Sequence, residues 1–174
     1  IAFVPLDQLH RENLDQTLME FSLTNASEAE IANLNLAWHR LDPWPDVVPG
    51  LQKLKRGYQI GTLSNGNIDL IKNMARHAGL PWDAILGAEV ARAYKPQPQA
   101  YLGSAAALGF EPSQCMLVAA HNNDLEAALQ VGFKTAFVAR PFEHGPNQET
   151  DLFAEGEYEI VAQDFIDLAE QLGC

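Results

Sequence analysis

Cysteine, basic residues and long apolar runs are scarce in this sequence of 174 residues. Two cysteines, Cys115 and Cys174, are too few for a disulfide framework or a cysteine metal cluster. Lys and Arg number 11 against 23 Asp and Glu, and the net charge of −12 disfavours binding to a phosphate backbone, which needs clustered cations. No apolar run approaches the roughly 20 residues that span a membrane. We therefore expect no nucleic-acid partner, no membrane partner and a cytoplasmic location.

The first forty residues carry a helical pattern. Apolar residues such as Leu6, Leu14 and Leu18 recur at helical spacing, and a polar break at residues 24–27 precedes a second helix that Ser27 could cap. Pro43 and Pro45 then interrupt the chain, because proline fixes the backbone and cannot continue a helix. We place a boundary there, with a helical segment at 1–41 and a second unit at 42–174.

After this boundary, short apolar runs alternate with helical patterns. This alternation predicts an α/β fold with a doubly wound parallel sheet, covered by helices on both faces. The expected strands lie at 58–63, 84–86, 115–119, 133–138 and 159–161. The expected helices lie at 48–56, 68–78, 99–108, 124–131 and 165–172.

Three polar loops follow expected strands or precede expected helices. They are Ser64-Asn65-Gly66-Asn67, Tyr94-Lys95-Pro96 and His121-Asn122-Asn123-Asp124. Ligands of open parallel sheets bind beyond the carboxyl ends of the strands, so these loops are the candidate site. The first loop could dock an anion at a helix N-terminus, and Lys95 could supply a cation beside a carboxylate.

Each loop also has a plain structural explanation. Ser and Asn are common in turns and helix caps, a lone lysine is most often solvated, and Asp124 could only cap its helix. His121 could be a hydrogen-bonded structural histidine or could move a proton from water, since it titrates near neutral pH. The residues alone leave these alternatives open. The five histidines lack metal-ligand spacing, so we expect no metal site.

The ordered motifs resemble the haloacid dehalogenase superfamily. Ser64-Asn65-Gly66-Asn67, Tyr94-Lys95-Pro96 and Asp124 match its second, third and fourth motifs in order and spacing. Asp42-Pro43-Trp44-Pro45-Asp46 and His77-Ala78-Gly79-Leu80 look like the metal-independent 2-haloacid dehalogenase branch. The resemblance implies a Rossmann-like core with a small helical cap at 1–41, no cofactor and a small haloacid substrate, and it leaves a homodimer open.

The resemblance also implies roles for individual residues. Ser64 and Asn65 would hold the substrate carboxylate and the leaving halide, and Lys95 would neutralise the carboxylates of nucleophile and substrate. Asp124 would orient Lys95 or the hydrolytic water. The expected catalytic residues are Lys95, Asp124, His121 and Ser64, and the expected substrate-binding residues are Ser64, Asn65, Tyr101 and Asn122.

Two departures bear on the activity. Metal-dependent phosphatases of the superfamily usually carry an aspartate where this chain has Ala120, which removes a Mg²⁺-binding carboxylate and disfavours that chemistry. Dehalogenases commonly have Ser-Ser-Asn where this chain has Ala119-Ala120-His121. The histidine therefore replaces an amide near the reacting centre, and either the hydrolytic step or the substrate could differ.

A third departure is the absence of the family's nucleophile motif, Asp-x-(Asp or Tyr)-Gly-Thr, and of its substrate-binding arginine. Both should precede Ile1, together with the first core strand, so we expect a sequence truncated at its N-terminus. We expect the intact protein to hydrolyse short 2-haloalkanoates to 2-hydroxy acids through an aspartyl ester. The alternatives are a Mg²⁺-dependent phosphatase of the same superfamily and a catalytically inactive binding domain or fragment.

Overall fold

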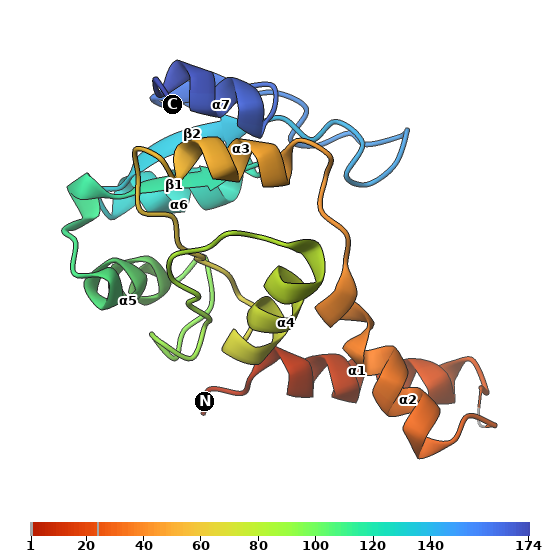
Figure 1. Cartoon of the computed structure of the whole chain (residues 1–174). Coiled ribbons are helices and arrows are strands. Elements are labelled where there is room, and N and C mark those ends of the chain that lie inside the picture. Colours follow the sequence, from red (N-terminus) through yellow and green to blue (C-terminus); the bar gives the residue numbers. More distant parts are fainter. Residues whose placement is uncertain (1, 24) are drawn as a thin grey trace.

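The computed structural model describes residues 2–23 and 25–174, and Figure 1 shows their arrangement. The chain begins with the helices α1 (Leu6–Glu20) and α2 (Glu28–Asn35) and the 3-10 helix η1 (Leu36–Arg40). The elements that follow are, in chain order, α3 (Val47–Leu54), α4 (Ile68–Ala78), α5 (Pro98–Leu108), η2 (Pro112–Gln114), β1 (Met116–Ala119), α6 (Asn122–Gln130), β2 (Lys134–Val138), β3 (Ile160–Ala162) and α7 (Phe165–Gln171). None of these helices is long and apolar enough to cross a membrane.

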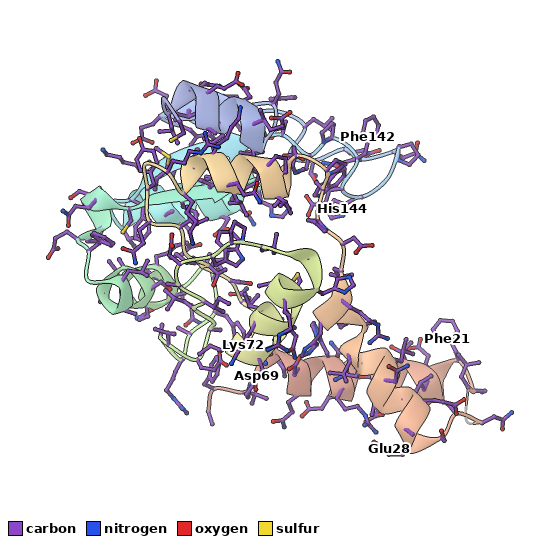
Figure 2. The ribbon with its side chains drawn as sticks, in the orientation of Figure 1. Phe21, Glu28, Asp69, Lys72, Phe142 and His144 are labelled. Atoms are coloured by element: carbon purple, nitrogen blue, oxygen red, sulfur yellow. The ribbon has the colours of Figure 1, made fainter. Side chains whose placement is uncertain are left out.

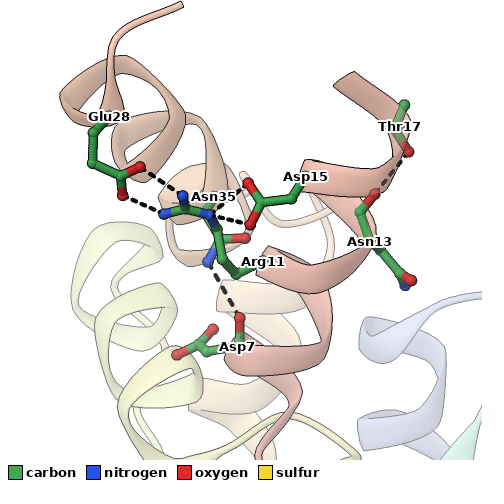
Figure 3. A network of polar contacts seen from close by, with 7 residues as sticks. All are labelled: Asp7, Arg11, Asn13, Asp15, Thr17, Glu28 and Asn35. Atoms are coloured by element: carbon green, nitrogen blue, oxygen red, sulfur yellow. Dashed lines mark hydrogen bonds and ion pairs between the residues drawn. The ribbon is translucent and has the colours of Figure 1, made fainter. Parts of the chain in front are cut away.

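The helical pair α1 and α2 projects from the rest of the protein (Figure 1). Ser27 caps α2 as predicted and forms a capping box with Glu30. Thr24, in the predicted polar break, lies outside the described residues. Arg11 of α1 joins the helices by contacting Asp15 at 2.9 Å and Glu28 at 2.5 Å (Figure 3). The guanidinium therefore holds a helical hairpin together, as the sequence pattern predicts.

The hairpin is fastened to α4 by polar contacts. The Asn67 amide Nδ2 donates to Asp7 Oδ2 at 2.8 Å, and His39 Nε2 lies 2.9 Å from Asp7 Oδ1. His39 Nδ1 in turn lies 3.0 Å from Asn73 Nδ2. These contacts tie the first forty residues to the remainder, and the boundary between 1–41 and 42–174 stays a prediction.

The described residues form a three-stranded parallel sheet in the order β1-β2-β3, which confirms the predicted α/β fold class. Val118 of β1 pairs with Ala136 of β2, and Ala136 pairs with Ile160 of β3. Along β2, alternate side chains enter opposite cores, as the two-residue period of a strand requires. Ala136 packs in one core and Phe137 in the other.

Helices cover both faces of this sheet (Figure 1). One core joins Leu51 and Leu54 of α3 to Leu168 of α7, and the other joins Tyr101 of α5 to Leu125 of α6. Helices lie on both faces of the parallel sheet because each buried strand face needs an apolar cover, and this is the predicted doubly wound arrangement. The bounds of these helices agree with the predictions to within two residues.

The strands predicted at 58–63 and 84–86 are wrong, because these segments form only an isolated bridge between Gly61 and Ala84. Backbone bonds join the two segments at that bridge, where the N–H groups of Thr62 and Ala84 donate to the carbonyls of Ala84 and Ile60. Next to it, side chains take part as well: Thr62 Oγ1 accepts from the N–H of Leu86, and Asp83 Oδ2 accepts from the N–H of Ile60. The pairing is therefore a single bridge flanked by side-chain bonds rather than a continuous ladder.

A cavity of about 690 Å³ separates residues 59–64 from residues 115–118 of the β1 region. Apolar side chains of α3 and α7 line it, as do Ala105 and Leu108 of α5. The cavity thus lies within the helix-covered layer of the fold, between one extended segment and one edge of the sheet. Ser64 reaches its lining from the end of the 59–64 segment.

Candidate active site

The predicted residues Lys95, Tyr101 and Asp124 meet in one hydrogen-bonded cluster. Lys95 Nζ lies 2.5 Å from Asp124 Oδ2, and the Tyr101 hydroxyl donates to Asp124 Oδ1 at 2.6 Å. The side chains of Lys95 and Asp124 are 21% and 12% exposed, so the ion pair is partly withdrawn from water but still accessible. A cation and an anion are thereby held at the start of α6, where the helix dipole favours the carboxylate.

Asn65 connects this cluster to the first polar loop. Its side-chain Oδ1 accepts from the backbone N–H of Lys95 at 2.7 Å, and its Nδ2 donates to the Lys95 carbonyl at 3.4 Å. Both groups of the amide therefore hold the Lys95 backbone. This finding gives Asn65 a positioning role that the sequence did not predict, and its role as a substrate-binding residue stays a prediction.

Ser64 lies beside this connection, on the lining of the cavity. Its Oγ accepts from the N–H of Gly66 at 3.0 Å, which is the local turn that the structural alternative predicts. The hydroxyl hydrogen is free to point elsewhere, because the oxygen is only the acceptor in this bond. Ser64 can thus stabilise the loop and still donate to a ligand.

The N-terminus of α4, predicted as an anion site, already holds a carboxylate of the chain. Glu89 Oε1 accepts from the N–H of Ile68 at 2.8 Å. Gly87 permits this approach, since a Cβ at that position would lie 2.3 Å from Glu89 Oε2. Glu89 was not predicted from the sequence. The only signal was an acidic residue two positions after Gly87, which is a common pattern in loops.

His121 lies at the N-terminal end of α6, at the carboxyl side of β1, and contacts a second loop. Its Nε2 lies 3.0 Å from Glu143 Oε2, and its side chain is 41% exposed. Among the described residues, no hydrogen bond joins His121 to Lys95 or Asp124. If Nε2 carries the proton and donates to Glu143, the other ring nitrogen is left as a proton acceptor. The sequence analysis did not predict Glu143 as its partner.

Asn122 does not join the cluster. Its buried amide donates to Asp151 Oδ1 at 2.9 Å and to the Phe153 carbonyl at 3.1 Å. Its oxygen accepts from the Glu155 N–H and from the Tyr158 hydroxyl. Because all four contacts secure the loop that precedes β3, the geometry favours a structural role over the predicted substrate contact.

Burial and the bond to Asp124 raise the pKa of Tyr101. The phenol therefore stays protonated and acts as a donor rather than as a base. Lys95 is left as the positive group of the cluster, and Ser64 as a hydroxyl donor at the adjoining cavity. An anionic substrate with a reacting carbon would find charge compensation and hydrogen-bond donors here, which suits attack by a carboxylate.

Comparison with known proteins identifies the family. The model of the haloacid dehalogenase-like hydrolases matches residues 4–132, which is most of the chain. The chain belongs to the haloacid dehalogenase-like hydrolases. The matched region includes Ser64, Lys95 and Asp124, so the cluster lies within the part of the chain that defines the family.

Curated relatives of this haloacid dehalogenase-like hydrolase are mostly dehalogenases. An (S)-2-haloacid dehalogenase of Xanthobacter autotrophicus is 33% identical over 132 residues, covering 75% of this chain and 51% of the relative. (S)-2-haloacid dehalogenase 4A of Burkholderia cepacia is 30% identical over 130 residues, covering 67% of this chain and 56% of the relative. The chain therefore spans about half the length of these curated relatives.

Similar solved structures also include 2-haloacid dehalogenases. The crystal structure of a defluorinating L-2-haloacid dehalogenase is 53% identical with a TM-score of 0.97, over 100% of this chain and 72% of that one. An L-2-haloacid dehalogenase of Xanthobacter autotrophicus with chloropropionic acid covalently bound is 25% identical with a TM-score of 0.81, over 98% of this chain and 77% of that one. This hydrolase thus shares its fold with 2-haloacid dehalogenases over almost its whole described length.

Proposed function

We propose that the protein containing this chain hydrolyses short 2-haloalkanoates to 2-hydroxy acids. The observation that carries this proposal is the cluster in which Asp124 pairs with the ammonium of Lys95 while Asn65 holds the Lys95 backbone beside Ser64. A fixed ammonium lowers the free energy of bringing a carboxylate nucleophile and a substrate carboxylate together, because it offsets their mutual repulsion. The names of the relatives, which are 2-haloacid dehalogenases, point to the same substrate class.

The first chemical step in this proposal needs a nucleophilic aspartate that the printed sequence does not contain. A strand from another segment of the protein fits the cavity between residues 59–64 and 115–118, since its apolar walls suit a strand with both faces buried. A carboxylate at the end of that strand would emerge near Ser64. Its oxygen bonds to the halogen-bearing carbon, the carbon–halogen bond breaks, and the halide leaves with the bonding pair.

The second step releases the product from the aspartyl ester. Water attacks the carbonyl carbon of the ester while one of its protons passes to the free ring nitrogen of His121. The bond between that carbon and the oxygen on the substrate then breaks, and this oxygen takes the proton from His121 and leaves as the hydroxyl of the 2-hydroxy acid. The aspartic acid that remains loses its proton to solvent and is a carboxylate again. Glu143 holds the imidazole by its Nε2 at 3.0 Å, which favours the tautomer that can accept the proton.

Halide release by the full-length protein tests the proposal. We expect chloride release from chloroacetate or 2-chloropropionate that continues in EDTA. Absence of release with both substrates would contradict the proposal. Phosphate release that EDTA abolishes would support the Mg²⁺-dependent phosphatase instead.

A lysine variant tests the cluster itself. Lys95→Ala should lower kcat/KM for the haloacid by about 100-fold or more, because the charge compensation is lost. Lys72→Ala is the matched control, since Lys72 is an exposed lysine of α4 (Figure 2). Equal activity of the two variants would remove Lys95 from the mechanism.

The proposal also covers the cellular location and the oligomeric state of the protein. A cytoplasmic location suits the free thiols Cys115 and Cys174, since a reducing compartment keeps thiols unpaired. A homodimer is part of the same proposal, because α1 exposes Met19 and the following turn exposes Phe21 and Leu23. Light scattering on the full-length protein measures the assembly directly, and a monomeric mass at working concentration would overturn this part.

A further inference from the structure

Three potential metal ligands come together at the carboxyl side of β1. His121, Glu143 and His144 each offer one ligand atom, and these atoms lie within 4.8 Å of one another. His121 comes from the start of α6, whereas the other two belong to the turn that follows β2. Figure 2 shows His144 and Phe142 on this loop, at the edge of the core near the chain that leads to the helical hairpin.

We propose that these three side chains bind one divalent transition-metal ion of the zinc class. Two imidazoles and one carboxylate are a ligand set that suits Zn²⁺, Co²⁺, Ni²⁺ or Cu²⁺, whereas Mg²⁺ and Ca²⁺ prefer oxygen ligands throughout. Bonds of about 2.0–2.2 Å to a central ion require only small side-chain rotations from the observed separations. A fourth position is left for water or an anion.

The third ligand distinguishes this cluster from an ordinary ion pair. His121 and Glu143 alone, at 3.0 Å, would be a surface histidine–carboxylate pair like His77 and Asp42, which lie 2.9 Å apart. Among the described residues, only His121, Glu143 and His144 form a group of three possible ligands. The sequence predicts no metal site because 22 residues separate His121 from Glu143. The fold brings them together.

Metal binding has a consequence for the proposed activity. A bound ion is coordinated by a ring nitrogen of His121, and the imidazole then cannot accept a proton from the hydrolytic water. It also fixes the turn after β2 against the start of α6. The ion therefore acts as a reversible inhibitor of ester hydrolysis, and this consequence rests on the proposed function, whereas the binding itself does not.

Calorimetric titration of the full-length protein with Zn²⁺ tests the site. The exposed residue His144 has no part in the proposed chemistry, so His144→Ala should fold normally and bind Zn²⁺ at least about tenfold more weakly. His77→Ala is the matched control and should bind like the wild type. Co²⁺ provides a second readout, since a visible absorption band of a four-coordinate ion should appear in the wild type and vanish in His144→Ala.

The outcomes separate this proposal from the enzymatic one. Equal Zn²⁺ affinity in wild type and His144→Ala, or no heat of binding at all, would overturn the metal site whatever the protein hydrolyses. If halide release is measurable, Zn²⁺ should inhibit the wild type and spare His144→Ala, while Mg²⁺ should affect neither. Zn²⁺ binding without any halide release would uphold the site and count against the proposed function alone.

Discussion

The hydroxyl of Tyr101 donates to Asp124 Oδ1 at 2.6 Å, on the opposite carboxylate oxygen from the one that Lys95 contacts. The tyrosine is fully buried, and its ring meets Phe133 edge to face at a centroid distance of 6.2 Å. The buried tyrosine thus fixes one oxygen of the Asp124 carboxylate, while the other oxygen contacts the Lys95 ammonium. The orientation of Lys95 depends in part on a residue buried in the core.

Removal of this hydroxyl should cost both stability and activity. Tyr101→Phe leaves Asp124 Oδ1 without its buried donor, and we expect the free energy of unfolding to fall by about 1–3 kcal/mol. We also expect kcat to fall more than KM rises, because the Lys95–Asp124 pair loses its fixed geometry. Tyr58→Phe is the control, since the Tyr58 hydroxyl bonds a carbonyl at the exposed surface. Denaturant unfolding and steady-state kinetics check both effects, and equal results for the two variants would contradict the role.

Local signals in the sequence were enough to predict several elements. The helix predicted at residues 68–78 is α4, and Gly79 follows it in the left-handed conformation, with φ of 66°, that ends many helices. The strand predicted at 115–119 is β1, an apolar run in which Leu117 is buried and the other side chains are partly buried. The contact between Lys95 and Asp124 was expected from the family resemblance rather than from local signals.

Other features depend on partners that the local sequence does not name. The segment 58–63 has a strand-like composition, yet it pairs with its neighbour through one bridge only, and the side chains of Thr62 and Asp83 bond the backbone N–H groups beside it. The amide of Asn122 bonds the loop before β3, contacts that its local sequence does not indicate, and its substrate-binding role stays a prediction. Glu143 lies in a polar segment without periodicity, so its contact with His121 emerges only from the fold.

A largely buried ion pair joins the start of α3 to the segment just after β2. Asp46 Oδ2 accepts from Arg140 at 2.7 Å and from the N–H of Phe165 at 2.9 Å, and the ion-pair side chains are 13% and 11% exposed. Burial alone would raise the pKa of Asp46, but the bonds from Phe165 and Arg140 hold that pKa below its usual range. The paired carboxylate therefore stabilises the fold above a pH of about 4, and this contribution is lost as the pH falls through the lowered pKa.

Breaking the Asp46–Arg140 pair should lower the stability of the fold. Arg140→Met removes the cation and leaves Asp46 buried without it, so we expect the free energy of unfolding at neutral pH to fall by about 3 kcal/mol. The matched control is Lys53→Ala, which breaks the exposed contact between α3 and Glu170 of α7 and should cost at most about 1 kcal/mol. Urea unfolding of the two variants measures the difference. Similar losses in both would show that burial does not set the strength of the Asp46 pair.

Close packing of α3 against α7 gives a further prediction. A Cβ on Gly50 would lie 2.4 Å from Phe165 Cβ and 2.6 Å from the Phe165 carbonyl carbon. Gly50→Ala should therefore push the helices apart and lower the free energy of unfolding by about 1–3 kcal/mol, despite the better helix propensity of alanine. Gly57→Ala is the control, because its Cβ would meet only the Cys174 side chain at 3.2 Å. A Gly50→Ala protein as stable as the control would contradict this packing.

The helical hairpin should respond to mild acid through His10. Its ring stacks on Trp38 at a centroid distance of 4.8 Å, and its Nδ1 is buried without a hydrogen-bond partner in the described part of the chain. Burial lowers the pKa of His10, Asp7 opposes the shift, and His39 adds to it. The unfolded chain takes up the proton near pH 6.5, so the stability present above that pH is lost as the pH falls through the lower folded pKa.

A variant with a ring that cannot be protonated isolates this effect. His10→Phe keeps an aromatic surface against Trp38, and the other four histidines are unchanged, so their contributions cancel in the comparison. We expect the melting temperature of the wild type to fall more steeply than that of His10→Phe as the pH is lowered from about 7.5 to about 5.5. Parallel curves would show that His10 binds its proton equally well in the folded and unfolded states, which would contradict the lowered pKa. Steeper loss in the variant would reverse the assigned sign, because it would mean that the charged imidazole stabilises the hairpin.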